Sequence, residues 1–206
     1  MTDLRYTLLG DGASDKVLLP VLDWLLANHA AVPFTRQWAD LQRLLDPPVG
    51  LEQRVLRAFE IYPCNLLFVH RDAERAPRAA RIAEIHAVLQ PQPPAVCVVP
   101  VRMQEAWFLF NEPALREAAG RPASRNALNL PPLRRTEAIP DPKSVLHNAL
   151  LAASGLHGRR RRLFPVRARV HRLADLIQDF APLRALPAFA ALEADVRAIL
   201  LAHGWA

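Results

Sequence analysis

The sequence predicts an α/β fold, with a small, mostly parallel sheet flanked by helices and a helical C-terminal half. Short apolar runs with strand composition alternate with amphipathic helical segments over residues 1–111. The connections between these runs are long enough for the right-handed crossovers that a parallel sheet requires. Beyond them the apolar pattern is helical and interrupted by prolines. We therefore expect one compact unit, with an α/β core over 1–111 followed by an arginine-rich helical region over 112–206.

Three runs have the composition of buried strands. Leu4–Gly10, Asn65–Val69 and Ala95–Val99 are almost continuously apolar, which is typical of strands covered on both faces. Val32–Leu41 fits either a short strand or a loop. The continuous apolar character of Asn65–Val69 predicts a central position in the sheet.

The remaining apolar residues mostly recur at helical spacing. In the segment after the first strand, apolar side chains lie three and four residues apart, which predicts one buried helix face. A helix also begins within residues 102–110, and Arg121–Pro140 reads as an irregular excursion. The other helices are expected at Ser14–His29, Leu51–Phe59, Ala76–Leu89, Pro113–Ala119, Pro142–Ala153, Arg169–Phe180 and Phe189–His203.

Composition favours a soluble, cytoplasmic protein. The apolar fraction is 51% and the charged fraction 22%, both ordinary for a globular chain. No apolar run approaches the ~18 residues that a membrane span needs, and the first residues lack a basic-then-apolar leader. We therefore expect no membrane partner. Cys64 and Cys97 have no metal-type spacing, so we expect both to be reduced thiols.

The basic charge is concentrated in one segment. From Pro142 to Ala174 there is no acid, so that segment carries +8 and leaves −2 for the rest of a chain whose total is +6. Local basic charge suits a polyanion such as DNA or RNA. The alternative is a solvated arginine-rich loop. The expected nucleic-acid contacts are Arg159, Arg160, Arg161, Arg162, Arg167 and Arg169.

Polar side chains follow the first two clear strands at the points where these strands end. Asp11, Gly12 and Asp15 follow the first run, and His70 and Asp72 follow the second. The carboxyl ends of parallel strands meet at one edge of the sheet, where ligands bind. Carboxylates gathered there repel one another unless a cation lies among them. The pattern predicts a divalent-metal site formed by Asp11, Asp15, His70 and Asp72.

Each of these residues also has a plainer explanation. Asp11 can be a turn residue and Asp72 a helix cap. Asp15 can be stabilised in a first helical turn by the helix dipole without any metal. His70 can simply form a hydrogen bond to a neighbour.

Two further residues complete the expected catalytic group. Glu105 follows the third strand beside Trp107, where low polarity raises a carboxyl pKa or favours cation binding. Lys143 follows a proline at a helix start and can contact a phosphate, although an exposed lysine is an equal alternative. The expected catalytic residues are Asp11, Asp72, Glu105 and Lys143.

The ordered set of these motifs resembles the TOPRIM fold of topoisomerases, bacterial primases and the overcoming-lysogenization-defect nucleases. An acid with glycine follows the first strand of that fold, and Asp-x-Asp follows a later central strand. The set is most similar to a family of small, uncharacterised bacterial TOPRIM-like proteins, whose pattern continues with Glu-x-Trp-Leu, Pro-Lys and a C-terminal Phe helix. The matching segments here are Asp11–Asp15, His70–Asp72, Glu105–Leu109, Asp141–Lys143 and Leu186–Phe189. The resemblance implies that the α/β core over 1–111 is TOPRIM-like.

Two positions depart from the TOPRIM pattern. Asp11 stands where glutamate is common, and His70 replaces the first Asp of Asp-x-Asp. Imidazole favours Mn²⁺ or other transition ions over Mg²⁺. The replacement therefore implies a shifted metal preference, the loss of one metal position, or loss of catalysis.

The resemblance implies a Mg²⁺- or Mn²⁺-dependent nuclease or phosphodiester transferase that acts in a bacterial defence or mobile-element system. A catalytically silent module that binds nucleic acid or protein is one alternative, and a small-molecule phosphohydrolase is another. No Walker loop is present, so any partner ATPase would be supplied in trans.

Overall fold

A computed structural model describes residues 3–89 and 93–206. Met1 and Thr2 lie outside the described residues. They begin the segment for which the sequence predicted no leader. The chain forms a four-stranded parallel sheet in the order β2-β1-β3-β4. The strands are β1 (Leu4–Leu9), β2 (Phe34–Trp38), β3 (Leu66–His70) and β4 (Ala95–Val98). The predicted α/β class with a small parallel sheet is confirmed, and the ambiguous segment before residue 41 contains the edge strand β2.

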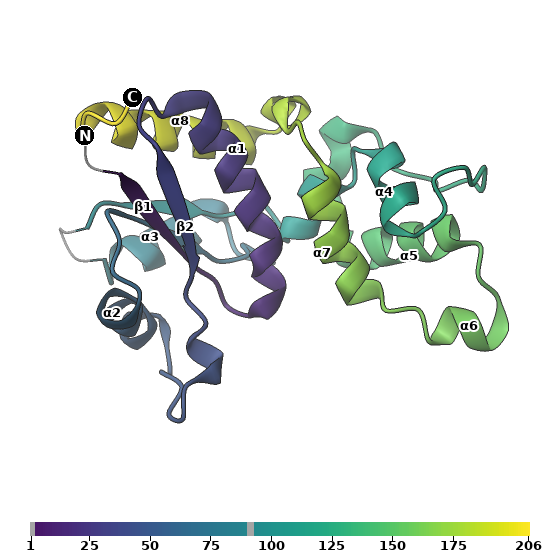
Figure 1. The fold of residues 1–206 in the computed structure, drawn as a ribbon, viewed down its shortest axis with the longest axis horizontal. Coiled ribbons are helices and arrows are strands. Elements are labelled where there is room, and N and C mark those ends of the chain that lie inside the picture. Colours follow the sequence, from purple (N-terminus) through teal and green to yellow (C-terminus); the bar gives the residue numbers. More distant parts are fainter. Residues whose placement is uncertain (1–2, 90–92) are drawn as a thin grey trace.

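Helices connect the strands and make up most of the second half of the chain (Figure 1). The α-helices are α1 (Leu19–His29), α2 (Leu51–Ile61), α3 (Arg78–His86), α4 (Glu112–Ala118), α5 (Pro142–Ser154), α6 (Gly158–Arg162), α7 (Val166–Leu176) and α8 (Pro187–Ala202). The 3₁₀ helices are η1 (Ala13–Leu18), η2 (Leu41–Arg43), η3 (Gln104–Phe108), η4 (Leu133–Ala138) and η5 (Ala181–Ala185).

The helix expected to begin at Ser14 starts as a 3₁₀ segment and becomes α-helical only at Leu19. Pro20 explains the change, because proline has no N–H to donate and is tolerated best in the first turn of an α-helix. The result is a separate short turn, η1, directly after β1. This turn carries Asp15 to the carboxyl edge of the sheet.

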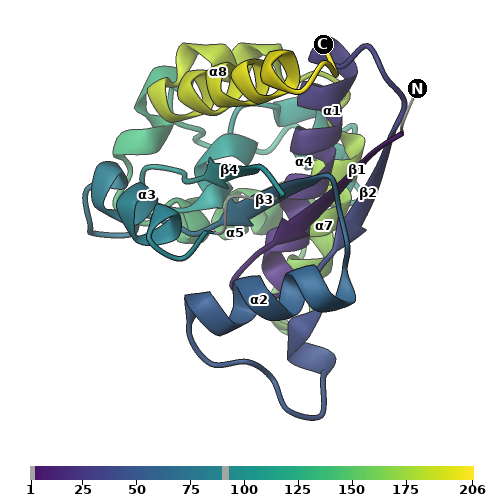
Figure 2. The ribbon, with the colours of Figure 1, turned by 90° about the vertical axis from the view of Figure 1, so that its left-hand side faces the viewer.

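The two faces of the sheet are covered by different helices. Alternate residues of the strands, such as Tyr6 and Phe68, form one core with α1 and α8. Leu67 and Val69 belong to a second core with α2 and α3. Figure 2 shows α1 and α8 on one side of the strands and α2 on the other. The alternation follows from the two-residue period of a strand, and burial on both faces explains the continuous apolar runs.

The C-terminal half is divided between two places. Helices α4, α5 and α7 pack on one another beside the sheet, and α7 also contacts η1. Helix α8 returns to the sheet, where it packs against β4 and α1. The larger hydrophobic core runs without interruption through both parts. The helical lobe is thereby held against the carboxyl edge of the strands.

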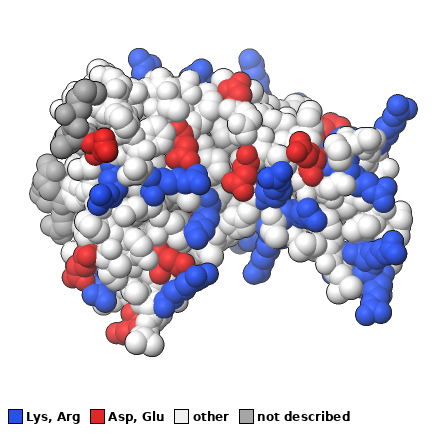
Figure 3. All heavy atoms as spheres, in the orientation of Figure 1, with Lys and Arg blue, Asp and Glu red and all other residues white. Residues whose placement is uncertain are grey.

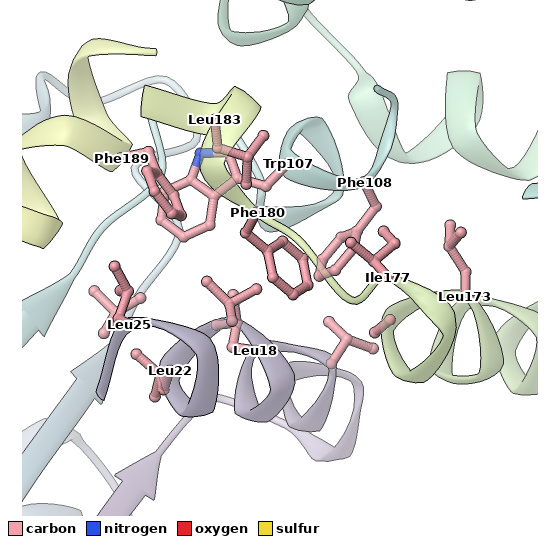
Figure 4. Packing of buried hydrophobic residues seen from close by; sticks show 14 of the residues in the cluster. Leu18, Leu22, Leu25, Trp107, Phe108, Leu173, Ile177, Phe180, Leu183 and Phe189 are labelled. Carbon is pink, nitrogen blue, oxygen red and sulfur yellow. The ribbon is translucent and has the colours of Figure 1, made fainter. Parts of the chain in front are cut away.

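Aromatic residues fill the junction between the sheet helices and the lobe (Figure 4). Trp107 and Phe189 are fully buried and meet edge to face, with ring centroids 5.5 Å apart. Phe180 points into the same space from the connection between α7 and α8. Burying an aromatic side chain of this size contributes about 2–3 kcal/mol. This packing fixes η3, and with it the residues that η3 contributes to the site.

The arginine tract differs from the exposed loop that the flanking glycines suggest. Residues 158–162 form the short helix α6, with all four arginines exposed. Arginine is a good helix former, and Gly158 adopts a positive φ of 55° that other residues rarely adopt. The exposure is as expected, and only the local conformation differs. Among the described residues, no helix has both the length and the apolar character needed to cross a bilayer.

Candidate functional site

Asp15 holds the loop after β1 in place. Its Oδ2 accepts the backbone N–H groups of Asp11 at 2.7 Å and Gly12 at 3.1 Å, and its Oδ1 accepts the side-chain amide of Gln104 at 3.0 Å. Gly10 permits this close approach, since a Cβ there would lie 2.7 Å from Asp15 Oδ2. Asp15 therefore joins the β1 loop to the β4 loop. The amide contacts satisfy much of its charge without a cation.

His70, the last residue of β3, is buried and faces two carboxylates. Its Nδ1 lies 2.9 Å from the carbonyl oxygen of Val98, so Nδ1 carries a proton and donates it there. Its Nε2 lies 3.5 Å from Asp72 Oδ1 and 3.9 Å from Asp15 Oδ2. In the neutral ring Nε2 is an acceptor, and three acceptors then converge. A proton or a cation at this point resolves the conflict. Metal-binding histidines commonly donate their other ring N–H to a carbonyl in this way.

Asp72 is the carboxylate whose ionisation this environment changes most clearly. Its Oδ1 accepts the backbone N–H of Gln104 at 2.9 Å. Burial raises the pKa of Asp72 from 3.8 to about 6; the charge of His70 opposes the rise, and Glu105 and Asp15 add to it. Asp72 can therefore hold or release a proton near neutral pH.

Glu105 and Gln104 come to the site from η3. Glu105 is buried, and its nearest cation is Lys143, whose Nζ lies 3.9 Å from Oε1. Burial raises the pKa of Glu105, and Lys143 offsets part of the rise. The side-chain oxygen of Gln104, a 2% exposed residue, has no hydrogen-bond partner among the described residues. A buried acceptor without a donor is uncommon in folded proteins, and here it lies beside carboxylates.

The donor set suits a hard divalent cation in chemistry but does not form a closed cage. Within 3–89 and 93–206, no group of three or more His, Cys, Asp or Glu side chains is arranged to hold a metal ion. Mg²⁺ is usually held by one or two carboxylates, with water and substrate phosphate completing its shell. The orphaned Gln104 oxygen and the facing acceptors of His70 and Asp72 fit that kind of open site.

A cavity of about 340 Å³ adjoins these carboxylates. Glu105 and Gln104 form part of its lining, and Lys143 and His147 of α5 and Arg167 and His171 of α7 contribute basic side chains. The cavity thus has one carboxylate, Glu105, on the side of the sheet edge and basic side chains on the side of the helical lobe. Its remaining lining residues are Ala13, Ser14, Val17, Gln42 and Val170.

The basic side follows from helix periodicity. Lys143 and His147 are four residues apart on α5, and Arg167 and His171 are four apart on α7, so each pair shares one helix face. The pKa of His147 is lowered, first by burial and then by Lys143 and Arg167, against the opposing effect of exposed Asp141. Burial likewise lowers the pKa of His171. The cations are therefore close enough to repel one another.

The start of α5 places Lys143 at the cavity. Asp141 is the N-cap, and its side chain accepts the backbone N–H of Ser144 at 2.9 Å. Pro142 occupies the first turn, where its missing N–H costs nothing. The Asp-Pro-Lys segment is therefore a helix start whose third residue faces Glu105.

Asp11 is engaged by arginines. Its Oδ1 lies 2.6 Å from Arg54 Nη1, and its Oδ2 lies 3.4 Å from Arg71 Nε. Arg54 also donates to the carbonyl of Gly10. The structure thus groups Asp15, His70, Asp72 and Glu105 with Lys143, while Asp11 is ion-paired toward α2. The sequence-based prediction of Asp11 as a metal ligand and catalytic residue gains no support from these contacts.

The predicted nucleic-acid contacts fall into three settings. Arg159–Arg162 are exposed, and none of their side chains forms a hydrogen bond or ion pair within the described residues. Figure 3 shows Lys and Arg side chains gathered over α6 with no acid beside them. Arg167 lines the cavity. Arg169 is half-buried, donates to the Ala118 carbonyl at 3.2 Å and lies over the Phe164 ring, so it helps to hold α7 on α4.

Three residues at the site were not predicted from sequence. Gln104, His147 and His171 all line the cavity or bridge its carboxylates. The spacing of a basic residue and a histidine four positions apart, present in both α5 and α7, was the available signal. Gln104 offered none, because its role depends on the approach of the β1 loop.

No protein-family model, curated protein or solved structure matches the chain.

Proposed function

We propose that the protein cleaves or transfers phosphodiester bonds of nucleic acid with the help of Mg²⁺ or Mn²⁺. The observation that carries the proposal is the two-sided cavity at the carboxyl edge of a parallel sheet. Glu105, a buried carboxylate with a raised pKa, lines one side and interacts electrostatically with Asp72, whose pKa is also raised, and the other side has cationic side chains. A phosphate bound to the basic side would lie beside the carboxylates, and a divalent cation between them would balance the charge.

His70 and Asp72, with Asp15, Glu105 and the free oxygen of Gln104 nearby, are the groups that would hold the cation. A bound divalent ion would polarise the phosphate and stabilise charge on the attacking and leaving oxygens. Lys143 and Arg167 neutralise and orient the phosphate. The Asp72 carboxylate, whose Oδ1 is fixed by the Gln104 backbone, can take a proton from an attacking water.

The direct test is nicking of supercoiled plasmid DNA with Mg²⁺, with Mn²⁺ and with EDTA. We expect metal-dependent nicking that Asp72→Asn lowers by about 100-fold or more, the scale of losing one electrostatic group at a reacting centre. Asp11→Asn should cost less than about tenfold, because Asp11 contacts arginines. Absence of nicking with every metal tested would remove the enzymatic proposal.

A catalytically silent nucleic-acid-binding module is the second candidate. The pairing of Asp11 with Arg54 and Arg71, and the lack of a preformed three-ligand group among the described residues, favour it. In that case DNA binding would persist without cleavage, and Asp72→Asn would leave binding unchanged. A gel-shift series run beside the nicking assay separates the two candidates.

A further inference from the structure

The basic side of the cavity lacks an anionic partner of matching charge. The Arg167 side chain forms no hydrogen bond or ion pair within the described residues, and Lys143 has only Glu105 at 3.9 Å. The charges of both cations act on His147, and exposed Asp141 offsets only part of their effect. Cations that converge on a cavity from two helices are stabilised by a bound anion. The arrangement therefore points to a phosphate-sized anion as the missing partner.

The size of the cavity limits what can carry that phosphate. At about 340 Å³ it lies at the lower end of the range for ligand sites, roughly 300–1,000 Å³. A duplex cannot enter the cavity whole, because its major groove alone is about 12 Å wide, so one strand at a time would reach the lining. A single phosphate with its attached sugar and base is the appropriate scale. The exposed arginines of α6 remain available for neighbouring backbone phosphates.

The lining also explains how one phosphate would be recognised. Lys143 supplies a point charge, whereas the guanidinium of Arg167 supplies paired N–H donors suited to two phosphate oxygens. His147, on the same face of α5 as Lys143, adds a ring N–H. Together these donors suit a terminal phosphate, which has more free oxygens than a phosphodiester.

We infer that this cavity is a pocket for the phosphate of a single nucleotide, held by Lys143, His147 and Arg167. The inference rests on the proposed function for its choice of nucleic acid and names the ligand as a phosphorylated strand end, such as the end that nicking leaves. A free mononucleotide presents the same chemistry, so the experiment must separate the two sources.

The test is fluorescence anisotropy with a labelled single-stranded DNA 10-mer in EDTA, where no cleavage occurs. Three forms are compared: 5′-phosphate, 3′-phosphate and unphosphorylated. The readout is the ratio of dissociation constants between unphosphorylated and phosphorylated strands, which cancels the attraction that both strands share. We expect a ratio of about ten for one of the two ends, the scale of one charge-assisted contact.

Lys143→Gln and Arg167→Gln should each bring that ratio close to one. The matched control is Arg172→Gln, an exposed arginine on the same helix outside the cavity lining, which should leave the ratio unchanged. A ratio of one in the native protein, or equal ratios in all three variants, would overturn the inference. Deoxyadenosine 5′-monophosphate is added as competitor. Displacement of the strand at micromolar concentration identifies free nucleotides as a source, and weak displacement identifies strand ends.

These results are separable from those of the nicking assay. A phosphate preference without metal-dependent nicking would sustain the pocket and remove the cleavage proposal. Metal-dependent nicking by a protein with no phosphate preference would do the reverse.

Discussion

Two groups of buried acidic residues in this protein have opposite environments. Glu193 of α8 accepts three hydrogen bonds from Arg184 at 2.7–3.0 Å and lies 2.7 Å from His29 Nε2. The Arg184 hydrogen bond, with His29, lowers the pKa of Glu193 despite burial. Asp72 and Glu105 are also largely buried, but their pKa values are raised.

The difference in pKa direction shows which buried carboxylates lack partners that stabilise their charged form. Glu193 has a complete set of partners, so it fastens α8 to α1 and the preceding turn. The carboxylates at the sheet edge lie near one another, and Asp72 lies near the acceptor nitrogen of His70. The lysine beside Glu105 comes no closer than 3.9 Å. Perturbed groups of this kind are concentrated at functional sites, although structural networks also produce them. The contrast favours the sheet edge as the place where a ligand supplies the missing charge.

The largest expected difference is in activity. Glu105→Gln should lower plasmid nicking by about 30-fold, because it removes a charge beside the reacting phosphate. Glu193→Gln should leave nicking within about twofold of the native rate, since it contacts Arg184 and His29, which lie outside the cavity lining. Rates are compared at equal metal concentration after circular dichroism confirms folding. Equal losses of nicking activity in the two variants would contradict the distinction between Glu193 and the carboxylates at the sheet edge.

The next effect is on stability. Glu193→Gln should lower the free energy of unfolding by about 2 kcal/mol at pH 7, because it weakens charge-assisted hydrogen bonds to Arg184 and His29. A lowered folded-state pKa contributes stability above the unfolded pKa and loses it as pH falls through the folded value. The loss caused by the substitution should therefore shrink toward pH 3. Urea unfolding measures both values, and a variant as stable as the native protein would contradict the assigned role.

A smaller change in stability, opposite in sign, is expected for Asp72→Asn. Its folded pKa of about 6 lies above the ordinary 3.8, so between these values the folded state binds more protons than the unfolded state. Stability then falls as pH rises from 4 to 6. Asp72→Asn should flatten this slope and be more stable than the native protein at pH 7.5 by about 1 kcal/mol. If Asp72→Asn instead destabilises the protein at pH 7.5, the charged carboxylate is stabilised by its contacts in the folded protein.

The smallest effect concerns charge that is exposed and unpaired. Replacing Arg159–Arg162 by glutamine should leave stability unchanged within about 0.5 kcal/mol. It should also flatten the dependence of log affinity for DNA on log salt, by about one for each phosphate that these arginines neutralise in the native protein. Binding titrations between about 50 and 200 mM salt measure the slope. An unchanged slope would place the nucleic acid elsewhere.

Much of the fold was predictable from local pattern. Continuous apolar runs identified β1, β3 and β4, because strands covered on both faces contain few polar residues. The edge strand β2 remained ambiguous, since it is partly exposed and its apolar signal is weak. The break between η1 and α1 could have been expected from Pro20.

The candidate site was predictable only in part. The positions of His70, Asp72 and Glu105 after successive strands indicated one sheet edge, and the structure brings them together with Asp15 and Lys143. Asp11 has the same position in its motif, yet Arg54 and Arg71 reach its side chain from α2 and the β3 loop. Such long-range ion pairs have no local signature.

The amino-acid sequence by itself determined the alternating strands and helices, the polar residues at strand ends and the isolated basic segment, because these depend on side-chain type and short-range spacing. Only the tertiary structure decided which charges meet. Packing of α7 on η1 and α4 brings Arg167 and His171 to the cavity, and the β1 loop turns Asp15 toward Gln104. These contacts join residues far apart in the chain, and their geometry is set by how the layers pack.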